Sequence, residues 1–128
     1  FGRKDIGATG AAGGIERIVM ALQRQGIMKK SLKELVYVAS TSDEVRTHAI
    51  EIVSTLRASG IAVDYDILGR ALRKQLDDAS IKGAALVVIV APSEIAMGKV
   101  IIRSMKDGTE STKPVTDIAK SIHGMLRA

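Results

Sequence analysis

Residues 10–22 form the clearest candidate for binding chemistry, a run of small residues that leads into an apolar helix, GAAGGIERIVMAL. Glu16 and Arg17 lie in the first turn of that helix, where a guanidinium could pair with a phosphate. A dinucleotide fingerprint needs Gly-x-Gly-x-x-Gly and a P-loop needs Gly-Lys-Ser/Thr, and the sequence contains neither. The residues alone favour close packing of a strand against a helix, with phosphate binding as the alternative.

Side chains that commonly perform acid-base chemistry are scarce and scattered. His48 and His123 each stand alone in a helical pattern, so we interpret them as surface or structural residues. Asp77 and Asp78 are adjacent on a predicted helix and point about 100° apart, which prevents joint action on one substrate atom and indicates a solvated face. The sequence has no cysteine, so it offers no disulfide and no thiolate ligand, and we predict no metal site.

Two local clusters of basic residues are candidates for contacts with a polyanion. The net charge is +5, but residues 1–34 hold seven Lys/Arg against three Asp/Glu, whereas residues 35–128 hold twelve against eleven. Net charge is therefore a weak argument that residues 35–128 bind a polyanion. The alternative interpretation of the basic clusters is an ordinary solvated surface. The clusters are Arg70, Arg73 and Lys74, and Lys99, Arg103 and Lys106.

The patterning divides the chain into residues 1–34 and a domain over residues 35–128. The first part holds a helix from about residue 15 to 25, with an apolar face that needs a covering surface, and a polar linker over 26–34. The chain begins with Phe1 rather than Met, which suggests a piece of a longer or processed protein. It contains no apolar run of the roughly 20 residues that a membrane span needs, so we expect a soluble, cytoplasmic protein.

The domain alternates short β-rich runs with amphipathic helices, which predicts an α/β fold. We expect a three-layer arrangement: a mixed sheet of about five strands with flanking helices, in the order β-α-β-α-β-β-β-α. Right-handed crossovers would join the first three strands in parallel. The expected strands are 35–39, 61–67, 85–91, 99–103 and a segment within 109–115.

Local signals refine these elements. Thr41 with Glu44 three residues on predicts a capping box, and Thr116 predicts the cap of the last helix. Asp107-Gly108 between two strand-like runs predicts a type I′ hairpin turn. The alternation in residues 61–67 places Asp64 and Asp66 on the wet face of their strand.

GAAGGIERIVMAL resembles motif 3 of the class II aminoacyl-tRNA synthetases, and it is most similar to the histidyl family. Residues 35–128, above all GRALRKQLDDA, resemble the anticodon-binding domain of that family. Residues 1–34 would then be a motif 3 remnant of the catalytic domain, a strand and helix, plus a linker. The resemblance implies that Arg17 contacts the ATP phosphates in the intact parent, with Glu16 beside it, and that the parent uses ATP and Mg²⁺. We expect the fragment to bind no cofactor and to be inactive alone.

The resemblance implies a histidine-tRNA ligase as the parent enzyme, with this fragment recognising the anticodon stem-loop of histidine tRNA. The parent would be a homodimer, with neither DNA nor membranes as partners. The expected phosphate contacts are Arg70, Arg73, Lys74, Lys99 and Arg103, and we expect backbone amides, arginine planes, Asp64 and Asp66 to read the bases. Two alternatives are a synthetase-like paralogue that binds RNA or protein without aminoacylation, and a small nucleotide-binding α/β protein.

Overall fold

The computed structural model describes residues 7, 9–27 and 34–127, and the chain divides into two compact units, Phe1–Leu32 and Lys33–Ala128. The first unit contains helix α1 (Ile15–Arg24), as predicted. Its apolar side chains stay accessible within the unit, since none is buried and Ile15 is 73% exposed. The predicted linker lies largely outside the described residues, because 28–33 are not among them. No described helix is long and apolar enough to cross a bilayer.

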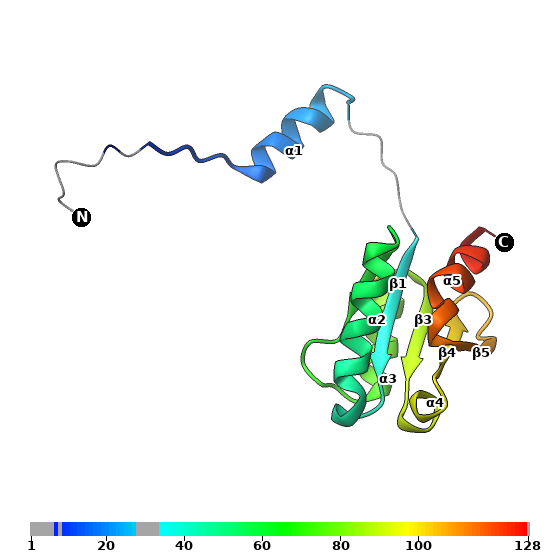
Figure 1. Ribbon diagram of the computed structural model, residues 1–128. Coiled ribbons are helices and arrows are strands. Elements are labelled where there is room, and N and C mark those ends of the chain that lie inside the picture. The colour runs from blue at the N-terminus through cyan, green and yellow to red at the C-terminus, as the bar shows by residue number, and fades with distance from the viewer. Residues whose placement is uncertain (1–6, 8, 28–33, 128) are drawn as a thin grey trace. The chain divides into compact units, whose positions relative to one another are not determined.

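The second unit is built on one five-stranded sheet in the order β2-β1-β3-β4-β5 (Figure 1). The first three strands are parallel, and β4 pairs antiparallel with both β3 and β5. This mixed sheet with flanking helices confirms the predicted fold class. The elements are β1 (Leu35–Ser40), the 3₁₀ turn η1 (Asp43–Val45), α2 (Arg46–Ala58), β2 (Ala62–Tyr65), α3 (Leu72–Ile81), β3 (Ala84–Val90), α4 (Pro92–Ala96), β4 (Lys99–Ser104), β5 (Glu110–Pro114), the 3₁₀ turn η2 (Val115–Asp117) and α5 (Ile118–Arg127).

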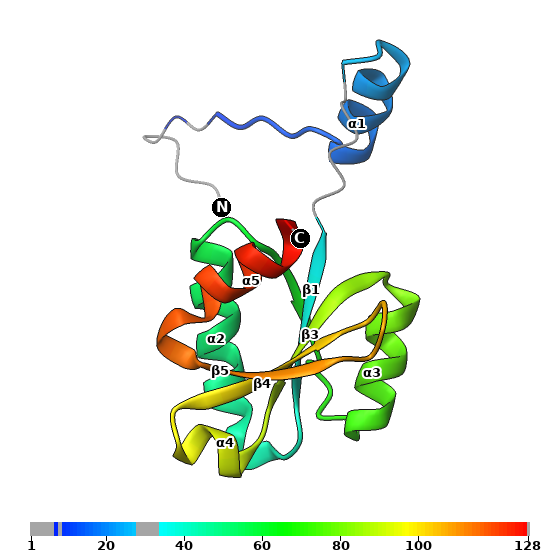
Figure 2. The same cartoon turned by 90° about the vertical axis from the view of Figure 1, so that its right-hand side faces the viewer.

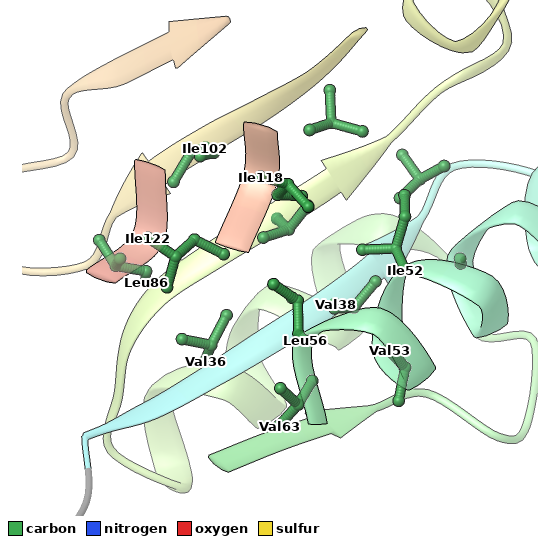
Figure 3. Packing of buried hydrophobic residues seen from close by; sticks show 14 of the residues in the cluster. Val36, Val38, Ile52, Val53, Leu56, Val63, Leu86, Ile102, Ile118 and Ile122 are labelled. Atoms are coloured by element: carbon green, nitrogen blue, oxygen red, sulfur yellow. The ribbon is translucent and has the colours of Figure 1, made fainter. Parts of the chain in front are cut away.

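Three layers result, because α2 and α5 lie on one face of the sheet and α3 lies on the other (Figure 2). The larger core is the one under α2 and α5. There Leu56 of α2 points toward Val36 and Val38 of β1, while Ile118 and Ile122 of α5 lie over β3 and β4 (Figure 3). The apolar run at residues 85–90 belongs to β3, which is buried on both faces, as an interior strand of the sheet should be.

Both predicted threonine caps are wrong, for related reasons. The Thr41 N–H donates to the Val90 carbonyl at 3.0 Å, so Thr41 continues the β1–β3 pairing and the helical turn begins only at Asp43. Thr116 lies inside η2, because the turn has already begun at Val115, whose N–H donates to the Gly98 carbonyl at 2.9 Å. Neither turn has a side-chain cap.

The predicted type I′ turn at Asp107-Gly108 is also wrong, although the antiparallel pairing of β4 with β5 is confirmed. A type I′ turn needs positive φ at two residues, and only Gly108 has one here, at 73°. Four residues, 105–108, separate Ser104 from Thr109, whose carbonyl accepts the Ser104 N–H at 2.9 Å. The Asp107 carboxylate accepts hydrogen bonds from the N–H and the hydroxyl of Thr109 and so braces the longer loop.

Candidate nucleic-acid interface

The carboxyl ends of β1, β2 and β3 meet at one edge of the sheet, toward which α4 also lies (Figure 1). The connection from β1 leads to β2 on one side, and the next connection crosses back to β3 on the other. Ligand sites in open α/β sheets form where the strand order reverses in this way. A small polar pocket of about 200 Å³ opens here, which we call the carboxyl-edge pocket. It is lined by Ser40, Thr41, Ser42, Asp43, Gly69, Arg70 and Ala71.

Gln75 fixes the start of α3 against the end of β1. Its side chain is 1% exposed, although it lies in a helix whose other polar residues mostly face solvent. The amide oxygen accepts the Ser40 N–H at 3.0 Å, and Nε2 donates to the Ser40 carbonyl at 2.9 Å. Nε2 also donates to the Arg70 carbonyl. The two walls of the carboxyl-edge pocket are therefore joined by one buried amide.

Arg70 and Asp66 shape the loop between β2 and α3. The Asp66 carboxylate accepts the backbone N–H of Arg70 at 2.7 Å and also the Nε–H of its guanidinium. Burial alone would raise the pKa of Asp66, but the hydrogen bonds from Arg70 lower it overall. Asp66 is 6% exposed, so the prediction that it lies on a wet face is wrong. The reason is that β2 ends at Tyr65, where the alternation of faces stops, and Ile67 is 66% exposed instead.

Asp78 of α3 is the centre of an ion-pair network between that helix and the sheet. One oxygen, Oδ2, receives Arg70 Nη2, Lys82 Nζ and the Tyr37 hydroxyl, each at 3.0 Å. The hydrogen bond from Lys82 is the largest influence that lowers the pKa of Asp78, to about 2. Lys82 also binds Asp64 at 2.8 Å, and this hydrogen bond is the main reason that the pKa of Asp64 is lowered. The prediction that Asp78 belongs to a solvated face is wrong, whereas Asp77 is exposed.

Tyr37 should make the stability of the domain fall at high pH. Its ring is fully buried, and burial together with the hydrogen bond to Asp78 raises its pKa to about 12. A raised pKa stabilises the fold below the unfolded value near 10, and the contribution is lost as the pH rises from about 10 to about 12. We expect the free energy of unfolding, measured with urea, to decline over that interval.

The Tyr37→Phe variant separates this titration from other effects. It should be less stable at neutral pH and should decline less steeply above pH 10, with Lys82 supplying the remaining slope. Tyr65→Phe, which leaves Tyr37 in place, should keep the full decline. Equal slopes for the wild type and Tyr37→Phe would contradict the assignment.

The predicted cations occupy three different settings. Arg73 and Lys74 are exposed in the first turn of α3, directly after the pocket residue Ala71, and make no ion pair within the described chain. Lys99 is the first residue of β4 and is also exposed. It lies at the carboxyl edge because β4 runs antiparallel to β3. Arg70, which was grouped with Arg73 and Lys74, precedes α3 and binds two carboxylates, those of Asp66 and Asp78.

Arg103 is separated from Lys99, since it lies at the far end of β4. It pairs at 3.3 Å with Glu110, its cross-strand neighbour on β5, so its charge is partly offset. The exposed positive charge at the carboxyl edge therefore comes from Arg73, Lys74 and Lys99. The predicted cluster of Lys99 and Arg103 is not a single patch.

The predicted ATP contacts lie in the other unit. Glu16 and Arg17 are exposed on α1, and the Arg17 side chain passes over Gly14, where an added Cβ would lie 3.7 Å from its Cγ. A shallow hollow on the same helix is lined by Arg17, Met20, Ala21, Arg24 and Gln25. Within the described ranges, no three His, Asp or Glu side chains are grouped as metal ligands.

Sequence reasoning missed Arg46 and Gly69, which join the two sides of the pocket. Arg46 Nη2 donates to the Ile67 carbonyl, and so it ties α2 to the loop before α3. Gly69 has a φ of 68°, and an added Cβ would lie 3.2 Å from Arg46 Nη1 and 3.4 Å from Asp43 Oδ1. The glycine that begins GRALRKQL was a signal for a left-handed turn. Nothing in the nearby sequence indicated that Asp43 and Arg46 would lie against it.

The family described as "Anticodon binding domain" matches residues 35–124. The chain belongs to this family. Histidyl-tRNA synthetase from Nostoc sp. PCC 7120 superimposes with a TM-score of 0.69 at 25% identity, over 88% of this chain and 28% of that one. The RNA-binding domain of threonyl-tRNA synthetase from Cryptosporidium parvum Iowa II, at 16% identity and a TM-score of 0.66, shares the fold over 73% of this chain and 24% of that one.

Curated relatives extend the similarity beyond the anticodon-binding domain. Histidine–tRNA ligase from Pyrococcus furiosus is 32% identical over 128 residues, which are 99% of this chain and 30% of that protein. Histidine–tRNA ligase from Thermococcus kodakarensis is 40% identical over 115 residues, 88% of this chain and 26% of that protein. The chain thus spans less than a third of the relatives it matches, and the similarity to the first of them includes α1.

Proposed function

We propose that the anticodon-binding domain in this chain binds the anticodon stem-loop of histidine tRNA. The observation that carries the proposal is the exposed positive edge, Arg73, Lys74 and Lys99, beside a polar pocket in a domain of this family. Cations that lack carboxylate partners are free to neutralise phosphates, and a pocket of hydroxyl and carboxylate groups suits the edge of an unpaired base. The histidine–tRNA ligase relatives support histidine tRNA as the partner.

The other predicted contacts have a different part in this proposal. Arg70 and Asp66 form an ion pair that positions the pocket loop, and Asp64 pairs with Lys82 at the end of α3, so we expect none of the three to touch RNA. Arg103 shares its charge with Glu110 and lies away from the edge, so we expect a smaller contribution from it.

The full-length protein is proposed to be a cytoplasmic, homodimeric histidine–tRNA ligase that uses ATP and Mg²⁺. In it, Arg17 would bind the ATP phosphates, a role that suits its exposed guanidinium, and Glu16 would lie beside it. Support comes from relatives of that activity that match α1 as well as the domain. ATP-dependent charging of histidine tRNA by the full-length protein tests this, and absence of charging would overturn it.

Arg73→Ala should weaken binding of the histidine anticodon stem-loop and of a loop with scrambled anticodon bases by the same factor. It should also reduce the slope of log affinity against log salt by about one unit, because a phosphate contact is lost. Lys74→Ala should behave in the same way. Fluorescence anisotropy of labelled stem-loops over a range of salt concentrations measures both quantities.

Lys120→Ala is the matched control, since Lys120 is exposed on α5, on the opposite face of the sheet. It removes one positive charge but should leave the salt slope unchanged. If Arg73→Ala and Lys120→Ala lowered affinity equally, net charge rather than a local contact would explain the binding.

A further inference from the structure

Asp43 is the carboxylate that lines the carboxyl-edge pocket. Its side chain is 89% exposed. Its one ion pair in the described chain joins Oδ1 to Arg46 Nη1 at 3.7 Å, which is too long for a hydrogen bond. Both carboxylate oxygens can therefore accept hydrogen bonds from a ligand. Close to phosphates such a group is repulsive, so its useful contacts on RNA are the N–H donors of a base edge.

The loop before α3 approaches the Asp43 carboxylate closely at Gly69 but leaves it exposed. Gly69 permits this close approach, because an added Cβ would lie 3.4 Å from Asp43 Oδ1 and 3.2 Å from Arg46 Nη1, and any larger residue would also be strained at a φ of 68°. Ile67 and Leu68, which directly precede Gly69, are 66% and 72% exposed. They offer apolar surface for the face of a base whose edge enters the pocket.

Bidentate recognition by a carboxylate requires two adjacent donors. Among the four RNA bases, guanine alone has two on its Watson–Crick edge, N1–H and N2–H, whereas uracil has N3–H and adenine and cytosine each have one amino group. The anticodon that pairs with the histidine codons is G-U-G, with guanine at its first and third positions. Guanine is therefore both the base that a carboxylate in the pocket can bind with two hydrogen bonds and a base of the proposed anticodon.

We propose that Asp43 reads one guanine of the anticodon by accepting hydrogen bonds from its N1–H and N2–H. Ser42 and Thr41 supply hydroxyls beside it, and Ile67 and Leu68 contact the face of the base. This assignment rests on the proposed function, because it names the base that the pocket selects within the anticodon stem-loop.

Inosine lacks the N2 amino group of guanosine and is otherwise isosteric, so it tests the contact directly. With the unaltered chain, inosine at one of the two guanosine positions should weaken stem-loop binding by about tenfold, the loss of one hydrogen bond to a charged group. Asp43→Ala should bind the guanosine loop more weakly and should lose most of its sensitivity to inosine at that position. Asp77→Ala removes an exposed carboxylate of α3 outside the pocket and should keep the full inosine penalty.

The outcomes separate this inference from the proposed function. If the histidine anticodon is preferred over scrambled loops but Asp43→Ala keeps the wild-type inosine penalty, the guanine assignment is wrong and the proposed function stands. If inosine costs nothing at either position, the assignment is likewise wrong. If the chain does not distinguish the histidine anticodon from scrambled loops at all, the proposed function fails and the guanine assignment fails with it.

Discussion

Replacing Gln75 with leucine should lower the free energy of unfolding by about 2 to 4 kcal/mol, although the two side chains are similar in size. The substitution removes the partner of the Ser40 N–H and of two carbonyls, those of Ser40 and Arg70. Buried backbone groups that lose their partners cost more than the hydrogen bonds contribute, and leucine cannot replace any of these contacts. Urea unfolding followed by circular dichroism measures the change.

Lys74→Leu is the matched control for this prediction, because it places the same side chain one residue earlier on the exposed side of α3. We expect it to change the free energy of unfolding by no more than about 0.5 kcal/mol. The account of Gln75 would be contradicted by a Gln75→Leu variant as stable as the wild type. Such a result would mean that water satisfies the backbone groups at the end of β1.

Leu56→Ala should destabilise the domain by about 2 to 5 kcal/mol. Leu56 is fully buried between α2 and the sheet, where it points toward Val36 and Val38 (Figure 3). Truncation removes apolar contacts from the centre of the larger core and leaves a cavity that rigid neighbouring strands cannot close. The same urea titration gives the value.

Leu68→Ala provides the comparison, since Leu68 is 72% exposed in the loop before α3. The identical truncation there should cost less than about 0.5 kcal/mol. Similar losses for the two leucines would show that α2 is not packed on the sheet as described.

Periodicity predicted what depends on burial alone. The apolar residues along 49–56 recur at helical spacing and form the buried face of α2, and the unbroken apolar run of the expected strand 85–91 forms β3. In each case the buried side chains belong to a single helix or strand, so residues close together in the sequence are enough to predict it. The short helix α4 escaped notice because five residues are too few to show a helical period.

The candidate site was less predictable because its partners are distant in the chain. Gln75 meets Ser40 across 35 residues, and Tyr37 meets Asp78 across 41. A polar residue on a helix normally faces solvent, so nothing local distinguished Asp78 from Asp77 or Gln75 from Lys74. Exposed cations such as Arg73 were predictable by type and position, whereas the ion pairs of Arg70 with Asp66 and Asp78 depend on the fold.

The central claim, that this domain recognises the histidine anticodon, is tested most directly by comparing two anticodon stem-loops at the same salt concentration. One carries the G-U-G anticodon, and the other has the same stem with those bases scrambled. Base-specific contacts predict that the scrambled loop binds at least about tenfold more weakly, since a mismatched base in a specific site usually costs about 1 to 3 kcal/mol. Equal affinity for the two loops would contradict the account and would leave only attraction between phosphates and a positive surface.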